Sequence, residues 1–165
     1  MEYRQDYDSP LGRILLTADD EGLTGLWFVD GGQRGGRGPS DGSGAGESPY
    51  FDAARRWLDA YFSGRDPGFT PPLHLMGTAF CNRVAGLLLE IPYGQTTTYG
   101  ALARRLAQER GGGASAQAVG GAVARNPILL IMPCHRVIGA DGSLTGYSGG
   151  LWRKRALLRL EQKME

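Results

Sequence analysis

The stretch "TTTYGALARRLAQERGGGASAQAVGGAVARN" (96–126) holds two short helical patterns separated by a run of glycines. Threonines can cap the first pattern, and its apolar residues recur at helical spacing: Tyr99, Leu102, Ala103 and Leu106. Ser115 can cap the second, which stops before Pro127. Two short helices joined by a glycine turn are typical of a helix-turn-helix.

The second of these helices is unusually small in its side chains: Ala116, Ala118, Gly120, Gly121, Ala122 and Ala124. Small residues let a helix backbone approach another helix or a narrow groove closely. Taken alone, the pattern favours tight packing against another helix.

Composition limits the function classes. The 165 residues suit one large domain or two small ones, and 41% hydrophobic with 21% charged residues is typical of a globular protein. A net charge of +1 argues against a basic protein that coats nucleic acid. The N-terminal residues lack the apolar run of a signal peptide, and no stretch approaches 18 apolar residues. We therefore expect no membrane association.

Cysteine and histidine are scarce. Cys81 and Cys134 could form at most one disulfide, which favours a reducing, cytoplasmic setting. Two cysteines are too few for a cysteine-rich zinc site, and the histidines, His74 and His135, lie far apart in the sequence. No metal site is predicted.

The first half of the chain alternates between apolar and flexible patterns. Residues 11–29 read as a hairpin of two apolar strands, and residues 48–64 as a helix that ends near Gly64. Between them, the Gly- and Ser-rich residues 30–48 are expected to form a mobile loop. Its arginines, Arg34 and Arg37, fit solvated loop charge better than phosphate contacts. Three prolines in 65–77 indicate a boundary, after which 78–92 reads as a helix.

An apolar run then leads into "PCHRVIG" (133–139), which places Cys134 beside His135. The thiolate is the nucleophilic form of cysteine, and an oriented imidazole can lower the thiol pKa. Neighbours in sequence do not necessarily face each other, however. Alone, this pair favours a buried structural cysteine.

Five segments in order, "GTAFCNRV", "IPYGQTTTYGALA", "AVGGAVARNP", "PCHRVIGADGSLTGYSGG" and "LWRKRALLRLE", change that interpretation. From about Gly77 to Glu161 they resemble the C-terminal domain of the O6-alkylguanine-DNA alkyltransferases, also called methylated-DNA–protein-cysteine methyltransferases. The first half is compatible with the small α/β domain of that family through its hairpin, its helix and "YFSGRDPGF". The resemblance implies an α+β fold, with an N-terminal α/β domain over 1–76 and a mainly helical alkyltransferase and DNA-binding domain over 77–165 that carries a winged-helix-like helix-turn-helix.

The resemblance also implies a reaction. Cys134 matches the acceptor that attacks the alkyl carbon on guanine O6 and keeps the alkyl group, so each molecule acts once and needs no cofactor. His135 matches the base that takes the thiol proton through a water, and Glu161 the carboxylate that orients it. Without the family, Glu161 reads as a solvated helix residue. Asn126 matches a residue that holds the turn together, and Tyr99 one that assists loss of the guanine.

Further positions match the base pocket and the DNA surface. Val137, Tyr147, Ser148 and Gly149 match pocket walls, whereas Lys154 fits a pocket residue or a surface lysine equally well. The implied partner of a monomer is double-stranded DNA containing O6-alkylguanine, contacted in its minor groove, with the base rotated out of the stack. The residues assigned to DNA contact are Ala116, Gln117, Ala118, Gly120, Gly121, Arg125 and Arg136.

Gln117 is the main departure from the family pattern, which has an arginine that replaces the extruded base in the stack. Glutamine lacks the charge and offers fewer donors, which predicts weaker duplex binding or slower base flipping. Ala85 and Cys81 also depart, in positions usually held by tryptophan and glutamine. Two alternatives stay open: a sensor that binds alkylated DNA without transfer, and a thiol hydrolase.

Overall fold

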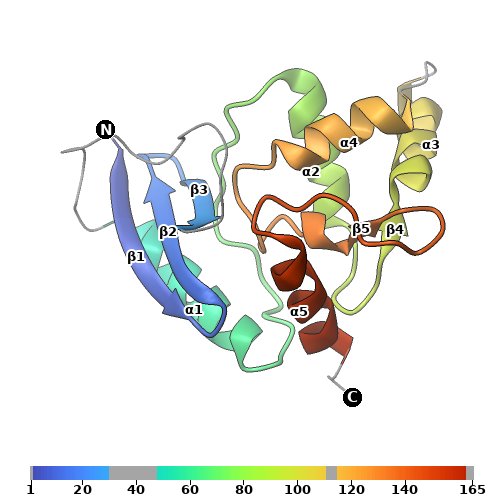
Figure 1. Ribbon diagram of the computed structural model, residues 1–165. Coiled ribbons are helices and arrows are strands. Elements are labelled where there is room, and N and C mark those ends of the chain that lie inside the picture. Colours follow the sequence, from blue (N-terminus) through green and yellow to red (C-terminus); the bar gives the residue numbers. More distant parts are fainter. Residues whose placement is uncertain (1, 30–47, 111–114, 163–165) are drawn as a thin grey trace.

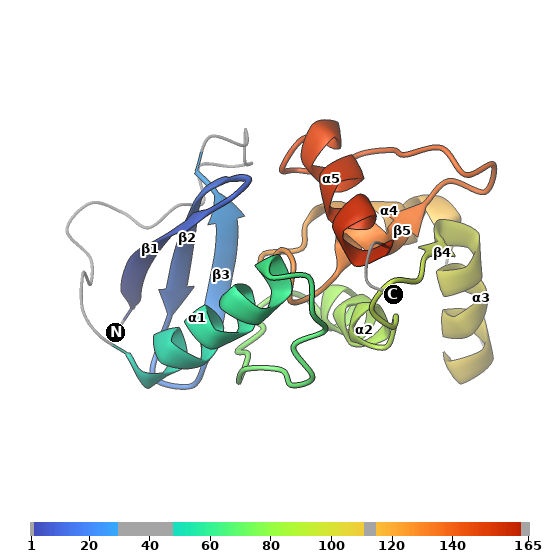
Figure 2. The same ribbon diagram turned by 90° about the horizontal axis from the view of Figure 1, so that it is seen from below.

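The computed structural model describes residues 2–29, 48–110 and 115–162, which form an α+β fold (Figure 1). In the N-terminal part, strands β1 (Tyr3–Ser9), β2 (Gly12–Ala18) and β3 (Leu23–Phe28) form an antiparallel sheet in the order β1-β2-β3. Helix α1 (Pro49–Phe62) contacts β1 and β2, and Figure 2 shows it lying along one face of this sheet.

The predicted hairpin over 11–29 is confirmed. β2 and β3 are antiparallel neighbours, and Ile14 pairs with Phe28. The Asp19 carboxylate accepts hydrogen bonds from the backbone N–H groups of Glu21 and Gly22, which fixes the turn between the strands. β1 was not predicted, because this edge strand is only partly buried and carries few strongly apolar residues. The predicted loop 30–48, with Arg34 and Arg37, lies outside the described residues except for Ser48.

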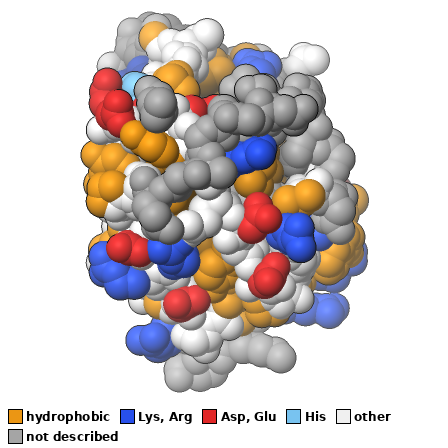
Figure 3. Space-filling view, turned by 90° about the vertical axis from the view of Figure 1, so that its left-hand side faces the viewer, with side chains coloured by type: hydrophobic (Ala, Val, Ile, Leu, Met, Phe, Trp, Pro, Cys, Tyr) orange, Lys and Arg blue, Asp and Glu red, His pale blue; other side chains and the backbone are white. Residues whose placement is uncertain are grey.

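Figure 3 shows one side face of the molecule, on which acidic and basic side chains are interspersed. Arg13 on β2 lies 3.8 Å from the carboxylates of both Asp6 and Asp8 on β1. The described part of the sheet therefore presents mixed charge rather than a single basic patch.

The predicted helix over 48–64 is confirmed as α1. The Ser48 hydroxyl accepts a hydrogen bond from the Tyr50 N–H and caps its start. The buried face of the helix consists of Phe51, Ala54, Trp57, Leu58 and Tyr61. Burial of this aromatic stripe against the sheet places the Tyr61 end of the helix toward the C-terminal half.

The C-terminal part is mainly helical. It consists of α2 (Ala79–Leu89), α3 (Tyr99–Arg110), α4 (Ala116–Ala124), a 3-10 turn η2 (Cys134–Arg136) and α5 (Leu151–Gln162). Short strands β4 (Thr97–Thr98) and β5 (Val137–Ile138) pair in parallel. Helix α4 packs against both α3 and α2. Thr78, Thr98 and Ser115 accept backbone N–H groups at the starts of α2, α3 and α4, respectively. The caps of α3 and α4 are those that the sequence predicts. The glycine turn over 111–114 lies outside the described residues.

The two halves share one hydrophobic core and are joined through β3. The Leu26 N–H donates to the Pro127 carbonyl, and the Leu129 N–H donates to the Leu26 carbonyl. The proline-rich segment 65–77 also pairs with β3, because the His74 N–H donates to the Leu23 carbonyl. The division into domains 1–76 and 77–165 stays a prediction. Among the described residues, no helix is both long and apolar enough to cross a membrane.

Candidate active site

Cys134 begins the 3-10 turn η2 and is 5% exposed. The segment that leads to it is held by Asn126, whose amide nitrogen donates to the Met132 carbonyl (2.8 Å) and whose amide oxygen accepts from the Ile128 N–H (2.9 Å). Leu130, which lies between Ile128 and Met132 in the chain, has a φ of 70°, a backbone conformation that costs energy for a bulky residue such as leucine. The Asn126 contacts therefore stabilise a loop that would not hold this shape alone.

Burial raises the pKa of the Cys134 thiol to about 11. A hydrogen bond with the Asn126 side chain and the nearby Lys154 charge act in the opposite direction and only partly offset it. The lowered thiol pKa that an adjacent imidazole can produce is therefore not found here. The resting thiol is protonated, and a base must accept its proton as it reacts.

His135 is completely buried beside Cys134 in the sequence. Its Nε2 lies 2.6 Å from Oε2 of Glu161, whereas its Nδ1 is buried without a hydrogen-bond partner in the described part of the chain. Burial lowers the pKa of the imidazole against the opposing effect of the Glu161 carboxylate. We infer a neutral ring that donates its Nε2 proton to Glu161 and leaves the Nδ1 lone pair free to accept a proton.

Glu161 on α5 is 2% exposed, so its interpretation as a solvated helix residue is wrong. Its oxygens accept from the His135 ring, the Tyr61 hydroxyl (2.6 Å), the Arg136 guanidinium (2.9 and 3.0 Å) and the Gly94 N–H (3.0 Å). Although burial alone would raise the pKa of this carboxyl, the hydrogen bond from His135 and the hydrogen bonds and positive charge of Arg136 lower it to about 2. Glu161 is thus a fully satisfied, ionised carboxylate.

The assignment of Arg136 to the DNA surface is wrong. The side chain is buried, and its guanidinium donates to both Glu161 oxygens and to the Ile91 carbonyl (2.7 Å). Its charge compensates the Glu161 carboxylate inside the protein, where an unpaired carboxylate would be costly. The guanidinium therefore does not reach the surface.

Tyr61 is a member of this group that the sequence did not identify as functional. It lies on the buried face of α1. The sequence offers no signal for a contact across 100 positions, and only the packing of α1 brings its hydroxyl to Glu161.

Two of the predicted base-pocket residues, Tyr147 and Lys154, contact His135 and β5, respectively. Val137 is buried, and the Tyr147 ring lies edge-on to His135 with centroids 6.4 Å apart. A Cβ at Gly149 would lie 2.8 Å from the Tyr147 ring, so only glycine fits there. Lys154 is also buried, and its Nζ donates to two backbone carbonyls, of Val137 and Thr145, at 2.7 Å each. The surface-lysine alternative is wrong.

Tyr99 and α4 face another side of the site. The Tyr99 hydroxyl lies 3.3 Å from Oγ1 of Thr145, and a Cβ at Gly120 would lie 3.7 Å from the Tyr99 ring. The first turn of α4 is exposed, including Ala116, Gln117 and Ala118, whereas Gly120 and Gly121 are half-buried. Arg125 ends the helix, exposed, with a guanidinium nitrogen 3.6 Å from the Cys81 sulfur.

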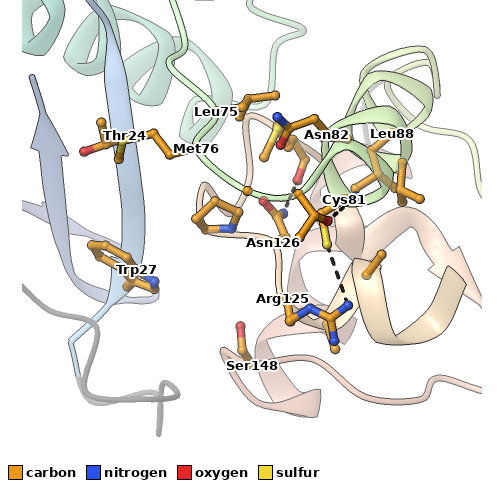
Figure 4. Close-up of a pocket in the computed structure, with 18 residues that line it drawn as sticks. Thr24, Trp27, Leu75, Met76, Cys81, Asn82, Leu88, Arg125, Asn126 and Ser148 are labelled. Carbon is orange, nitrogen blue, oxygen red and sulfur yellow. Dashed lines mark hydrogen bonds between the residues drawn. The ribbon is translucent and has the colours of Figure 1, made fainter. Parts of the chain in front are cut away.

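A cavity of about 360 Å³ lies between β3 and the helices α2 and α4 (Figure 4). Trp27 and Met76 line it on one side, and Cys81 and Arg125 on the other. Ser148, a predicted pocket wall, lines it, and so does Asn126, whose side chain hydrogen-bonds the Cys134 thiol.

A buried cysteine that directly precedes a buried histidine, itself held by an ionised carboxylate, is the set of groups from which cysteine nucleophiles are built. Two family models match this chain: the ribonuclease-like domain of 6-O-methylguanine DNA methyltransferase over residues 3–75, and the DNA-binding domain of the same family over residues 79–163. This chain belongs to the 6-O-methylguanine DNA methyltransferase family.

Individual relatives agree with this assignment. The methylated-DNA–protein-cysteine methyltransferase of Mycobacterium leprae is 44% identical over 162 residues, 98% of this chain and 93% of the relative. That of Methanosarcina acetivorans is 43% identical over 159 residues, 96% and 97% of the two chains. The crystal structure of Mycobacterium tuberculosis O6-methylguanine methyltransferase superposes with a TM-score of 0.84 at 42% identity, covering 100% of this chain and 95% of that one. A structure of the Mycobacterium tuberculosis protein in complex with DNA gives 0.82 at 41% identity, covering 98% and 94%.

Proposed function

We propose that this protein is a methylated-DNA–protein-cysteine methyltransferase that repairs DNA by moving the alkyl group of O6-alkylguanine irreversibly onto its own Cys134. Each monomer acts once, without a cofactor. One observation carries the proposal: a ring N–H of His135 donates to an ionised Glu161, its other ring nitrogen has no hydrogen-bond partner among the described residues, and the preceding residue is a buried, protonated cysteine. Its two free cysteines fit a reducing, cytoplasmic setting.

The chemistry is a direct displacement. The Cys134 sulfur forms a bond to the alkyl carbon while the bond from that carbon to guanine O6 breaks. The thiol proton passes to Nδ1 of His135 through a bridging water, and Glu161 stabilises the imidazolium that forms. The electron pair of the broken bond stays on the guanine, which takes up a proton with the assistance of the Tyr99 hydroxyl. The products are a thioether and an unmodified guanine.

The site sits inside the protein, so the damaged base must leave the duplex to reach it, at a cost of a few kcal/mol. The exposed first turn of α4 fits the narrow minor groove because its side chains are small: Ala116 and Ala118 flank Gln117 there. In this proposal Gln117 takes the place of the family's arginine beside the orphaned base. Arg125, at the other end of α4, adds an exposed positive charge.

The first test is the intact mass of the protein after incubation with an O6-methylguanine duplex. A gain of one methyl group that maps to Cys134 supports transfer, and the gain should persist in Cys81→Ser and vanish in Cys134→Ser. Duplex binding without a mass gain would instead support the damage-sensor alternative. If the protein shows neither duplex binding nor a mass gain, the thiol hydrolase is the remaining alternative.

The second test concerns Gln117. Gln117→Arg is expected to increase the transfer rate on an alkylated duplex and to leave the rate on free alkylguanine unchanged, because only the duplex requires base flipping. Gln162→Arg adds the same charge at an exposed position at the end of α5 and serves as the control. Equal duplex rates for wild type and Gln117→Arg would refute this role.

A further inference from the structure

The N-terminal part of the molecule supplies one side chain to the Cys134 site. Tyr61, at the end of α1, is completely buried, and its ring stacks on Trp57 with centroids 5.1 Å apart. Its hydroxyl lies 2.6 Å from Oε2 of Glu161 and 3.3 Å from Nε2 of His135. The same carboxylate oxygen therefore accepts from both the phenol and the imidazole.

This geometry makes the phenol a donor. Burial and the adjacent Glu161 carboxylate raise the pKa of Tyr61 well above its usual value, so it keeps its proton. A hydrogen bond from an O–H to a carboxylate is short and strong, and it withdraws negative charge from the oxygen that accepts it. Less charge then remains on Oε2 to attract a proton on His135.

We propose that Tyr61 is a positioning residue for the alkyl transfer: through Glu161 it orients the His135 ring and limits how readily that ring becomes protonated. The inference rests on the proposed function, since it assigns a part in that same reaction. Its consequence is that the packing of α1 against the C-terminal half tunes the nucleophile, although α1 contributes no atom to the reacting group.

Other charged and titratable groups also act on His135, and the structure shows where each comes from. Glu161 and Lys154 belong to α5, and Arg136 belongs to η2, where Cys134 precedes His135 in the chain. The rings of Tyr147, from the loop before α5, and Tyr61, from α1, lie edge-on to the imidazole. Arg136 and Lys154 oppose a positive charge on the imidazole, and Glu161 favours it. The Tyr61 phenol donates to Glu161, the group that favours a positive charge on the imidazole. Removal of the phenol hydroxyl therefore strengthens the attraction of Glu161 for a proton on the His135 ring.

The direction of the effect follows. His135 can accept the thiol proton only while its ring is neutral, so the transfer rate falls when acid protonates the ring. Loss of the Tyr61 hydroxyl raises the pKa of His135, and the acidic fall in rate therefore moves to higher pH. A loss of packing alone would slow the reaction by the same factor at every pH.

The experiment is the single-turnover rate of Cys134 methylation on a saturating O6-methylguanine duplex, measured as a function of pH for wild type and Tyr61→Phe. We expect the acidic fall in rate to move up by about 0.5 to 1 pH unit, which is about a 3- to 10-fold slower reaction below it. Tyr7→Phe is the matched control, because the Tyr7 hydroxyl also donates to a carboxylate of α1, Asp59, at 2.6 Å but lies outside the Cys134 site. Its profile should follow that of wild type.

An equal slowing at all pH values, or an unmoved profile, would overturn the inference. If Tyr61→Phe does not fold, 3,5-difluorotyrosine at position 61 keeps the shape and is a stronger donor. It should move the acidic fall to lower pH, and an unmoved fall in that variant likewise overturns the role of Tyr61. A wild-type protein that fails to methylate Cys134 would refute the proposed function itself, which separates the two failures.

Discussion

The carboxylate of Glu161 offers the sharpest test of how this site is built, through the variant Glu161→Gln. All the groups that contact its two oxygens are donors: the His135 ring, the Tyr61 hydroxyl, the Arg136 guanidinium and the Gly94 N–H. Glutamine has nearly the same shape, but one of its two positions is an NH2 group. Whichever way the amide turns, it sets donor against donor and leaves the buried Arg136 without its anion.

The size of the effect follows from the pKa of Glu161, which falls from 4.5 to about 2 on folding. Each pH unit is worth about 1.4 kcal/mol, so the ionised form stabilises the native state over its neutral form by about 3 kcal/mol. An amide resembles the neutral acid. We therefore expect Glu161→Gln to lower the free energy of unfolding at pH 7 by about 3 kcal/mol.

The pH dependence has a definite sign. Because the folded pKa is depressed, the contribution of Glu161 is fully present above pH 4.5 and is lost as the pH falls through about 2. Urea denaturation followed by tryptophan fluorescence should show the gap between wild type and variant intact near pH 5 and reduced to roughly half by pH 3. A gap below about 1 kcal/mol at pH 7, or one that does not narrow in acid, would refute the reasoning.

Two further variants test the neighbours of Cys134. Asn126→Ala removes two hydrogen bonds that hold the loop around Leu130. We expect it to lower the free energy of unfolding by about 2 kcal/mol and to slow transfer, both measured against wild type. An unchanged transfer rate would show that the loop presents the thiol without Asn126. Lys154→Met removes a buried ammonium that donates to two carbonyls and whose charge lowers the pKa of the thiol. We expect a loss of about 2 kcal/mol and a thiol that titrates at higher pH, detected by its ultraviolet absorbance in a Cys81→Ser background; a thiol that titrates at lower pH would contradict the placement of that charge.

Local patterns were sufficient for most of the helical elements. The Ser115 cap and the apolar spacing of α1 and α2 act within a few residues, so the sequence alone predicts these elements and the β2–β3 hairpin. Strand β1 was not predicted, because an edge strand that is only partly buried does not need a clear alternation of apolar and polar residues.

For the candidate site, too, the sequence predicted one part and not the other. The order of motifs around "PCHRV" identified Cys134, His135 and Glu161 through a resemblance, whereas their side-chain environment did not follow from it. The pKa of the thiol is raised, because burial outweighs the hydrogen bond and charge beside it. Arg136, adjacent to His135 in the sequence, turned out to be the internal counter-charge of Glu161.

The sequence by itself determined the helices, the hairpin and the family, and it predicted the nucleophile, because caps, periodicity and motif order are properties of short segments. Only the tertiary structure decided which groups meet at Glu161, because α1, η2 and α5 come together there from positions far apart in the chain. Burial, opposed by Asn126 and Lys154, sets the protonation of Cys134, and burial, opposed by Glu161, sets that of His135. Those free energies depend on distance in space, which sequence spacing does not record.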